Sequence, residues 1–321
     1  MPTSSNLYVD PALTGVSVLP SKNNKFIATD VAPVVTSQKE TGPIFRIDNA
    51  AGLLRKYDTK YAPGTETKLV DIEVDQTLTY NCVGHGLTGY VTDRERGAAD
   101  APARPAINKV QQLTDLLRLE REIAMVAAID ANVTATASPA NKWNDYTLGD
   151  PITEIDAQIT TIKGSGRKPN AFACDEAVLR AIKHHPDFRD YFKHVDTAGT
   201  YQSLDGAARG LATLLGLNYG FYADVTMQNT ADKGQTKSLA PIWSERFLLF
   251  YMEPNPGFQT GTMAVHVEWN NPAEGGGLIG GYSVETFREA KRKSDGVIVT
   301  NYYDPKFLNA AAAYLFTGVL N

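Results

Sequence analysis

The chain has 321 residues, 43% of them hydrophobic and 21% charged, which is the balance of a folded globular protein and excludes wholesale disorder. A single core stops growing below this length, so about two domains are expected. The formal net charge is −5 and no block of Lys or Arg occurs. This argues against a protein that grips nucleic acid, but not against one that encloses it.

Residues 1–42 contain four prolines, many Ser, Thr and Asn residues, and short apolar islands at 16–19 and 31–35 that have no helical period. Such a segment cannot bury enough surface to fold alone. We expect an extended arm that lies along a surface, that of another subunit included. A mobile tail is the alternative.

Residues 43–103 favour β structure. A short strand is predicted at 44–47 and one or two helical turns at 49–57. Apolar and acidic residues then alternate over 69–75, which predicts a strand with one wet face, and strand signals continue to Thr92.

The polar stretch 58–68, with Pro63-Gly64 at its turn, is the tip of this two-stranded excursion. Isolated hairpins are marginal in water, so we expect the excursion to lie on another surface. The predicted intersubunit contact consists of an apolar strand face and two tip residues: Val70, Ile72, Val74, Tyr61 and Lys60.

A charged, Ala- and Pro-rich connector at 93–103 leads into the organising element of the chain, a helix predicted over 105–134. This stretch has no internal Gly or Pro, and Leu, Ala, Glu, Gln and Arg dominate it. At 1.5 Å per residue the helix is about 40 Å long. Its apolar stripe drifts around the axis, so different neighbours should cover it along its length.

Helices and strands then alternate. Ile152, Ile155, Ile159 and Ile162 have helical spacing, with Asp150 as N-cap and Pro151 in the first position. The further predicted elements are a buried strand at 169–174, a helix at 176–185, a helix at 203–215 that ends at Gly216, and a strand at 217–223.

The last part of the chain contains mainly strand signals, at 240–252, 263–269, 282–293 and 297–302, and a Gly-rich turn at 274–281. The Ala-rich stretch 306–320 predicts a terminal helix or a mixed segment. The predicted helices and strands together indicate an α+β protein and not a βαβ array.

The motifs of catalysis and cofactor binding are absent. Residues 164–168 lack the phosphate-loop pattern, no GxSxG occurs, and His184, His185, Asp187 and His194 lack metal-ligand spacing. We interpret the histidines as cationic side chains at the C-terminal end of a helix, where the helix dipole favours positive charge. We interpret the acidic side of 69–75 as a solvated strand face. The sequence therefore predicts no enzyme, no catalytic residue, no cofactor and no metal.

The two cysteines, Cys82 and Cys174, lie far apart, and we expect two reduced thiols in a cytosolic product. No apolar run is long enough to span a membrane, and the start MPTSSNLYVDP lacks the features of a signal peptide. We expect a soluble protein with no membrane partner.

The order of extended arm, long hairpin, long helix and compact α+β domain resembles a tailed-bacteriophage major capsid protein, whose fold encapsulins and the herpesvirus capsid floor share. The resemblance covers roughly residues 30–310. Ordered short stretches carry it: 89–95 with 98–102, 119–122 in the spine helix, Trp143 to Ile155, Pro169-Asn170 with His185-Pro186, and Ile242-Trp243.

The resemblance implies four regions. They are an N-terminal arm at 1–42, an extended loop with flanking strands at 43–103, a peripheral domain at 104–150 plus 282–303 that contains the spine helix, and an axial domain at 151–281 plus 304–321. It implies a structural protein that self-assembles into hexamers and pentamers of an icosahedral shell around double-stranded DNA, located in the virion and assembled in the bacterial host cytoplasm.

The implied partners are further copies of the chain, a portal and a decoration protein, with no sequence-specific DNA binding. Only some forty residues precede the first strand, so the resemblance implies a separate scaffolding protein. Lys56, Lys60 and Lys68 lie where some relatives form a Lys–Asn crosslink, but the sequence identifies no Asn partner for them, so no crosslink is predicted. The alternatives are an encapsulin-like compartment and a soluble enzyme with an arm-exchanged dimer.

Overall fold

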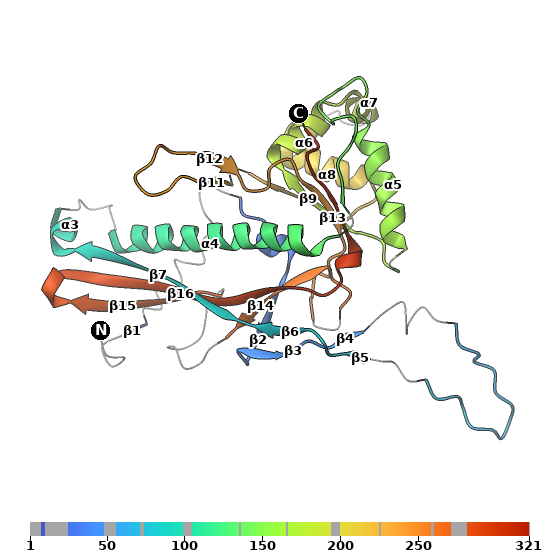
Figure 1. Ribbon diagram of the computed structural model, residues 1–321, viewed down its shortest axis with the longest axis horizontal. Helices are drawn as coiled ribbons and strands as arrows, with labels where there is room; N and C mark the ends of the chain where they lie inside the picture. Colours follow the sequence, from blue (N-terminus) through green and yellow to red (C-terminus); the bar gives the residue numbers. More distant parts are fainter. Residues whose placement is uncertain are drawn as a thin grey trace.

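The computed structural model describes residues 8–9, 25–47, 56–70, 74–98, 105–134, 136–164, 166–193, 200–224, 226–257, 260–270 and 281–320. These residues form the mixed α+β fold that the sequence predicts. The molecule is elongated, with a long helix beside a long sheet and a smaller body of helices and strands near one end (Figure 1).

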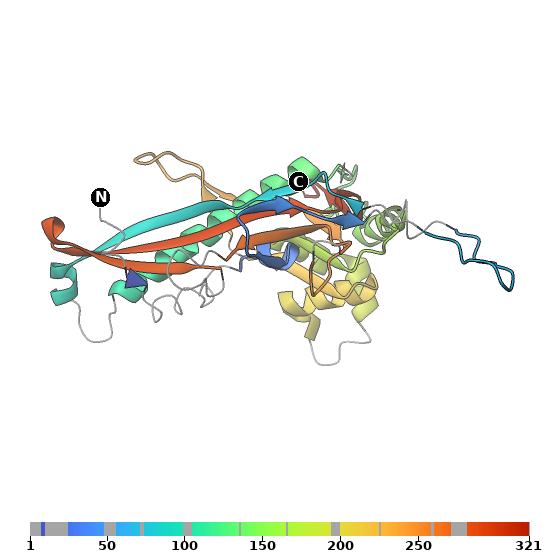
Figure 2. The same cartoon turned by 90° about the horizontal axis from the view of Figure 1, so that it is seen from below.

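The long sheet has six strands in the order β1-β15-β16-β14-β2, with β7 also paired to β16. The strands are β1 (Tyr8–Val9), β2 (Val34–Ser37), β7 (Val83–Thr92), β14 (Ala264–Trp269), β15 (Ser283–Glu289) and β16 (Ser294–Phe307). The helix α4 (Pro105–Asn132) runs along one face of this sheet (Figure 2). Apolar residues of its first half, such as Val110 and Leu117, pack on Val284 and Val297.

The second body contains a five-stranded sheet in the order β10-β9-β13-β17-β8. Its strands are β8 (Thr136–Ala137), β9 (Ala171–Asp175), β10 (Tyr219–Ala223), β13 (Phe247–Phe250) and β17 (Ala313–Phe316). Its helices are α5 (Pro151–Lys163), α6 (Glu176–His184), α7 (Pro186–Phe192), η3 (Thr200–Gln202) and α8 (Leu204–Leu214). A core with Trp143, Phe172 and Phe247 fills one side of the sheet.

A second core joins the two bodies. The second half of α4 contributes Met125 and Ile129, which pack with Trp243, Leu248 and Phe250 next to the five-stranded sheet. As expected for a drifting stripe, α4 is therefore covered by one body along its first half and by the other along its second half.

The remaining elements are short. They are α2 (Ala28–Val31), β3 (Thr41–Pro43), β4 (Arg46–Ile47), β5 (Val74–Asp75), β6 (Thr79–Asn81), α3 (Asp93–Ala98), β11 (Met227–Asn229), β12 (Leu239–Pro241), η4 (Ala290–Arg292) and η5 (Ala310–Ala312). Three two-stranded pairs, β3-β6, β4-β5 and β11-β12, stand outside the two sheets.

The predicted helices at the centre of the chain are confirmed. α5 begins where expected, because Asp150 accepts a hydrogen bond from the Thr153 amide at 3.1 Å and Pro151 occupies the first turn. α8 is capped by Ser203, and Gly216 after it has a φ of 64°, a left-handed conformation that favours glycine.

Over residues 25–42 the arm lies along its own subunit and contributes a few buried residues to that subunit's core, so the alternative of a mobile tail is wrong there. Ile27 and Val31 are fully buried against α4, and β2 pairs in parallel with β14. Within the apolar island, Val31 and Ala32 are buried next to α4, and 33–35 are half-buried beside β14. Residues 8–9 pair with β15, and the rest of 1–24 lies outside the described residues.

Two further expectations differ from the structure. The strand predicted over 69–75 is present only as β5 at 74–75, while 69–70 have no regular structure and 71–73 lie outside the described residues. The helical alternative for 306–320 is wrong, because β16 continues to Phe307 and β17 forms a central strand between β13 and β8. Burial of Ala313 and Leu315 in a sheet outweighs the helix propensity of alanine.

The division into four regions stays a prediction. β14 falls in the range assigned to the axial domain, yet it pairs with β16 in the long sheet. β16 itself runs past residue 303, the predicted limit of the peripheral domain.

Candidate assembly surfaces

The excursion at 56–70 extends away from both bodies (Figure 1). All of its residues are exposed, and apart from one turn they form no regular structure. Of the predicted contact residues, Lys60 is exposed, Tyr61 is 64% exposed and Val70 is 44% exposed. Ile72 and the side chain of Val74 lie outside the described part. The structure thus shows three of the five predicted side chains on one uncovered segment.

Leu69 is the residue that the sequence reasoning missed. Its side chain is 96% exposed. In a regular strand over 69–75, Leu69 would lie on the same side as Asp71 and Glu73. Leu69 and the adjacent Val70 thus form an apolar surface that the described residues of the subunit leave uncovered.

A polar clamp fixes the base of the excursion, where β4 pairs with β5. Arg46 forms an ion pair with Asp75, with Nε 3.1 Å from Oδ2, and it donates from Nη1 to the Leu308 carbonyl at 3.1 Å. The amide and hydroxyl of Thr77 also donate to Asp75 and, together with Arg46, lower the pKa of Asp75 to about 2. The two strands between which the excursion runs, β4 and β5, are therefore held side by side.

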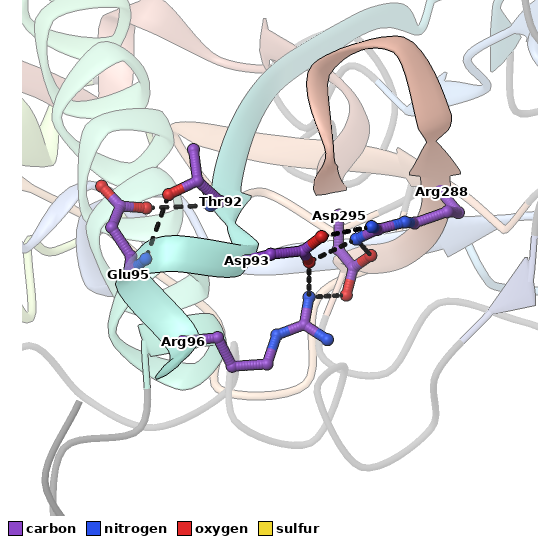
Figure 3. Close-up of polar contacts among 6 residues, drawn as sticks. All are labelled: Thr92, Asp93, Glu95, Arg96, Arg288 and Asp295. Atoms are coloured by element: carbon purple, nitrogen blue, oxygen red, sulfur yellow. Dashed lines mark hydrogen bonds and ion pairs between the residues drawn. The ribbon is translucent and has the colours of Figure 1, made fainter. Parts of the chain in front are cut away.

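A cluster of charges lies at the opposite end of the molecule, where β7 leads into α3 beside the β15-β16 turn (Figure 3). Arg288 binds Asp93 through two contacts of 2.7 and 2.5 Å and also binds Asp295 at 2.8 Å. Arg96 pairs with Asp295. Arg288 holds the pKa of Asp93 below its ordinary value, and the two aspartates raise the pKa of Arg288.

A capping box begins α3. The Glu95 amide donates to the Thr92 hydroxyl at 3.2 Å, and the Glu95 carboxylate accepts from the Thr92 amide at 2.9 Å (Figure 3). This pattern, Thr-x-x-Glu, stands in the sequence and marks the helix start within the connector. The charge cluster and the cap together hold α3 on the end of the sheet.

Two adjacent charged residues of α4 lie on its buried side. Glu122 is fully buried and accepts hydrogen bonds from the Ala28 amide at 2.8 Å, from the Ile27 amide at 3.1 Å, and from Trp243 Nε1. Burial raises the pKa of Glu122 despite these donors. One carboxylate thereby joins the arm, the spine helix and the second body.

Arg121 forms a buried ion pair with Glu268 of β14 at 2.8 Å and lies over the Tyr303 ring at 4.6 Å from its centroid. His266 is buried next to this pair, and burial together with Arg121 lowers its pKa to about 3. The sequence reasoning missed Arg121 and Glu122. The available signal was their spacing from Leu117 and Met125, which places both at core positions of the helix.

The described residues show no arrangement for metal binding, since no group of three or more His, Cys, Asp or Glu side chains among them could hold an ion. His184 lies exposed in the last turn of α6, as predicted. His185 is buried instead, and its Nε2 donates to the Gly149 carbonyl at 3.0 Å. His194 lies outside the described residues.

Both cysteines are buried and unpaired. Burial raises the pKa of Cys82 to about 12 and raises that of Cys174. Neither thiol therefore has the thiolate character of a reactive cysteine. In the part of the chain that the structure describes, no helix is long and apolar enough to cross a membrane.

No protein-family model and no curated protein matches the chain. Solved structures do. A phage-related protein from Bordetella bronchiseptica RB50 is similar with a TM-score of 0.70 at 19% identity, over 97% of this chain and 98% of that chain. The capsid protein of cyanophage P-SCSP1u has a TM-score of 0.57 at 11% identity, over 94% and 90%.

The SrpI encapsulin of Synechococcus elongatus is similar with a TM-score of 0.51 at 12% identity, over 97% of this chain and 95% of that chain. The likeness thus extends over nearly the full length of each protein. The chain has the fold of tailed-bacteriophage major capsid proteins, which encapsulins share.

Proposed function

We propose that the chain is a major capsid protein that assembles into hexamers and pentamers of an icosahedral shell around double-stranded DNA. The observation that carries the proposal is the uncovered excursion at 56–70 in a subunit with a shell-forming fold. An exposed Leu, Val and Tyr on a segment without its own core gain stability by lying on a neighbour.

The predicted contact, Lys60, Tyr61, Val70, Ile72 and Val74, is part of this proposal, and Leu69 is added to it. Many such contacts repeated by symmetry close a shell even when each one is modest. The net charge of −5 suits a container that holds DNA without neutralising its phosphates.

The proposal includes further partners and a location. The chain would act as a structural protein without turnover, be a component of the virion, and be assembled in the host cytoplasm. Its partners would be other copies of itself, a scaffolding protein, a portal and a decoration protein. The lack of recognisable catalytic motifs in the sequence supports a structural role.

A second candidate is an encapsulin-like compartment with a protein cargo. The similarity to the SrpI encapsulin over nearly the whole chain favours it. The two candidates share the shell and differ in what the shell encloses.

The test is purification of the expressed chain, alone and together with a co-expressed scaffolding protein, followed by electron microscopy and mass spectrometry of the contents. Closed particles of uniform diameter support the shell. Particles that are empty or contain scaffolding protein support a capsid, whereas one co-purifying host enzyme supports a compartment. A stable monomer or dimer at high concentration with the partner present refutes both.

A further inference from the structure

β10 forms an open edge of the five-stranded sheet. It pairs in parallel with β9 on one side, and among the described residues no strand pairs with its other side. The Tyr219 amide donates to the Asn170 carbonyl at 3.1 Å, which shows that the backbone groups of Tyr219 point toward β9. Because successive residues of a strand alternate, the N–H and C=O groups of Gly220 and Tyr222 point to the open side.

The sequence of this edge does not protect it. β10 reads YGFYA and contains neither a charged residue nor a proline, which are two of the devices that keep other strands from an edge. Its first three residues, Tyr219, Gly220 and Phe221, are half-buried. An open edge of this kind accepts an extended peptide through main-chain hydrogen bonds.

A pocket lies where β10 begins. Its volume is about 390 Å³, and its lining includes Lys168, Asn170, Asn218, Tyr219, Tyr251 and Glu253. One wall is fixed by Asn170, whose side chain donates to the Met252 carbonyl at 2.7 Å and accepts from the Met252 amide at 2.9 Å. The open edge therefore leads into a formed hollow at its first residue.

The pocket favours an anionic group. Lys168 donates from Nζ to the Gly216 carbonyl at 3.0 Å, which uses one of its three donors. Arg167 lies over the Tyr251 ring, 5.0 Å from its centroid. Glu253 is the acidic residue in the described lining, and its carboxylate accepts from the Tyr251 hydroxyl at 2.7 Å. Two cations thus stand against one carboxylate that already has a partner.

The opposite end of β10 is acidic, and the chain's own arm occupies it. The Lys25 amide donates to the Asp224 carbonyl at 3.1 Å in an antiparallel bridge. The Lys25 ammonium binds Asp205 at 2.9 Å and lies over the Tyr222 ring, 3.6 Å from its centroid. On this side of β10 an antiparallel contact with a basic residue at the acidic end is therefore already made.

We propose that the open edge of β10 binds the C-terminal tail of another protein as an added antiparallel strand, with the terminal carboxylate in the pocket beside Lys168. An edge that ends in a pocket fits the end of a chain. The antiparallel direction brings the carboxylate to Lys168 and Arg167, whereas a parallel tail would point away from the pocket. Two residues beyond the one opposite Gly220 span about 7 Å, which takes the tail past Tyr219 to Asn218.

The faces of the sheet define the composition of the tail. Tyr219 and Phe221 lie on one face, with ring centroids 6.2 Å apart, and pack against the core that contains Phe250. The tail residues on either side of the one opposite Gly220 lie on this same face. Apolar and β-branched side chains fit there best. The expected tail is therefore short, β-branched and free of a blocked end.

The test uses the purified full-length chain and a pool of heptapeptides. Each peptide begins with Lys, is randomised among Val, Ile, Thr and Tyr, and ends in a free carboxylate. Retained peptides are identified by mass spectrometry. The tightest binder is then made again as a C-terminal amide, and with a single N-methyl group on its fifth or its fourth residue. Affinities are measured for the wild type, for Lys168→Ala, and for Lys163→Ala, an exposed lysine of α5 outside the pocket lining, as the control.

We expect amidation and Lys168→Ala each to weaken binding about tenfold, without further loss when both are combined, and Lys163→Ala to change nothing. The fifth residue lies opposite Gly220 and its N–H points to β10, so its N-methylation should weaken binding at least about tenfold. The fourth residue's N–H points away, and its N-methylation should be tolerated. No retained peptide, equal binding of acid and amide, or equal effects of the two N-methyl groups overturns the inference. Each of these results leaves the shell function standing, because the test does not depend on assembly.

Discussion

Replacing Glu122 with Ala tests how the arm is attached to the spine helix. The carboxylate is the shared acceptor of three buried donors: the Ala28 amide at 2.8 Å, the Ile27 amide at 3.1 Å, and Trp243 Nε1. Ala removes the acceptor and leaves the donors in an apolar core.

Each buried donor left without a partner costs about 1–3 kcal/mol, which gives about 3–9 kcal/mol for three. The burial that raises the pKa of Glu122 shows that the ionised group is itself held at a cost, and Ala relieves it. We therefore expect a net loss of about 3–5 kcal/mol in the free energy of unfolding, similar to the loss of one partner from a buried charged contact.

The assay is urea unfolding of unassembled subunits, with Glu120→Ala as the control. Glu120 is two residues away on the same helix, but its side chain is 53% exposed and binds only His85 among the contacts described here. The control should lose less than about 1 kcal/mol. The exchange of the Ile27 and Ala28 amides should also accelerate in Glu122→Ala alone. Equal stability of the two variants would refute the reasoning.

The remaining predictions concern the excursion and the thiols. Leu69→Asp should leave the thermal unfolding of the subunit unchanged and prevent shell closure in electron micrographs, whereas Leu69→Met should close shells; normal shells from the Asp variant would contradict the proposed contact. Asp75 has a lowered pKa, so its stabilising contribution is complete above about pH 4 and is lost as the pH falls through about 2. The protection factor of the Thr77 amide in hydrogen exchange should therefore fall over that pH range in the wild type and stay constant in Asp75→Asn. Cys82 and Cys174 should resist iodoacetamide at pH 8 until urea unfolds the chain, and labelling of the native protein would contradict their burial.

The central helices were predictable because their signals are local. α4 lacks internal Gly and Pro, α5 has its Asp150-Pro151 start, and α8 has Ser203 before it and Gly216 after it. Caps and periodicity act within a few residues, so a single sequence displays them.

The surface that receives the arm was not predictable, because the arm's partners are distant in sequence. Val34 and Val35 lie opposite His266 and Val267, and Ile27 is held by Glu122. Nothing local distinguishes a strand of a long sheet from an apolar island in an extended tail. Burial there is decided by parts of the chain that follow much later.

The same limit applies to single residues. Glu120 and Glu122 look alike in the sequence, yet one is exposed and the other is fully buried. Only the periodic position of Glu122 on the buried side of α4 separates them. Leu69 shows the converse, because a strand pattern placed it in a ladder that the structure does not form.

A cryo-electron microscopy reconstruction of the assembled particle tests the central claim most directly. The account predicts a closed icosahedral shell in which residues 56–70 of each subunit lie on a neighbour and cover Leu69 and Val70. A reconstruction in which these residues fold back on their own subunit, or a preparation that contains no closed particle under any assembly condition, would contradict it.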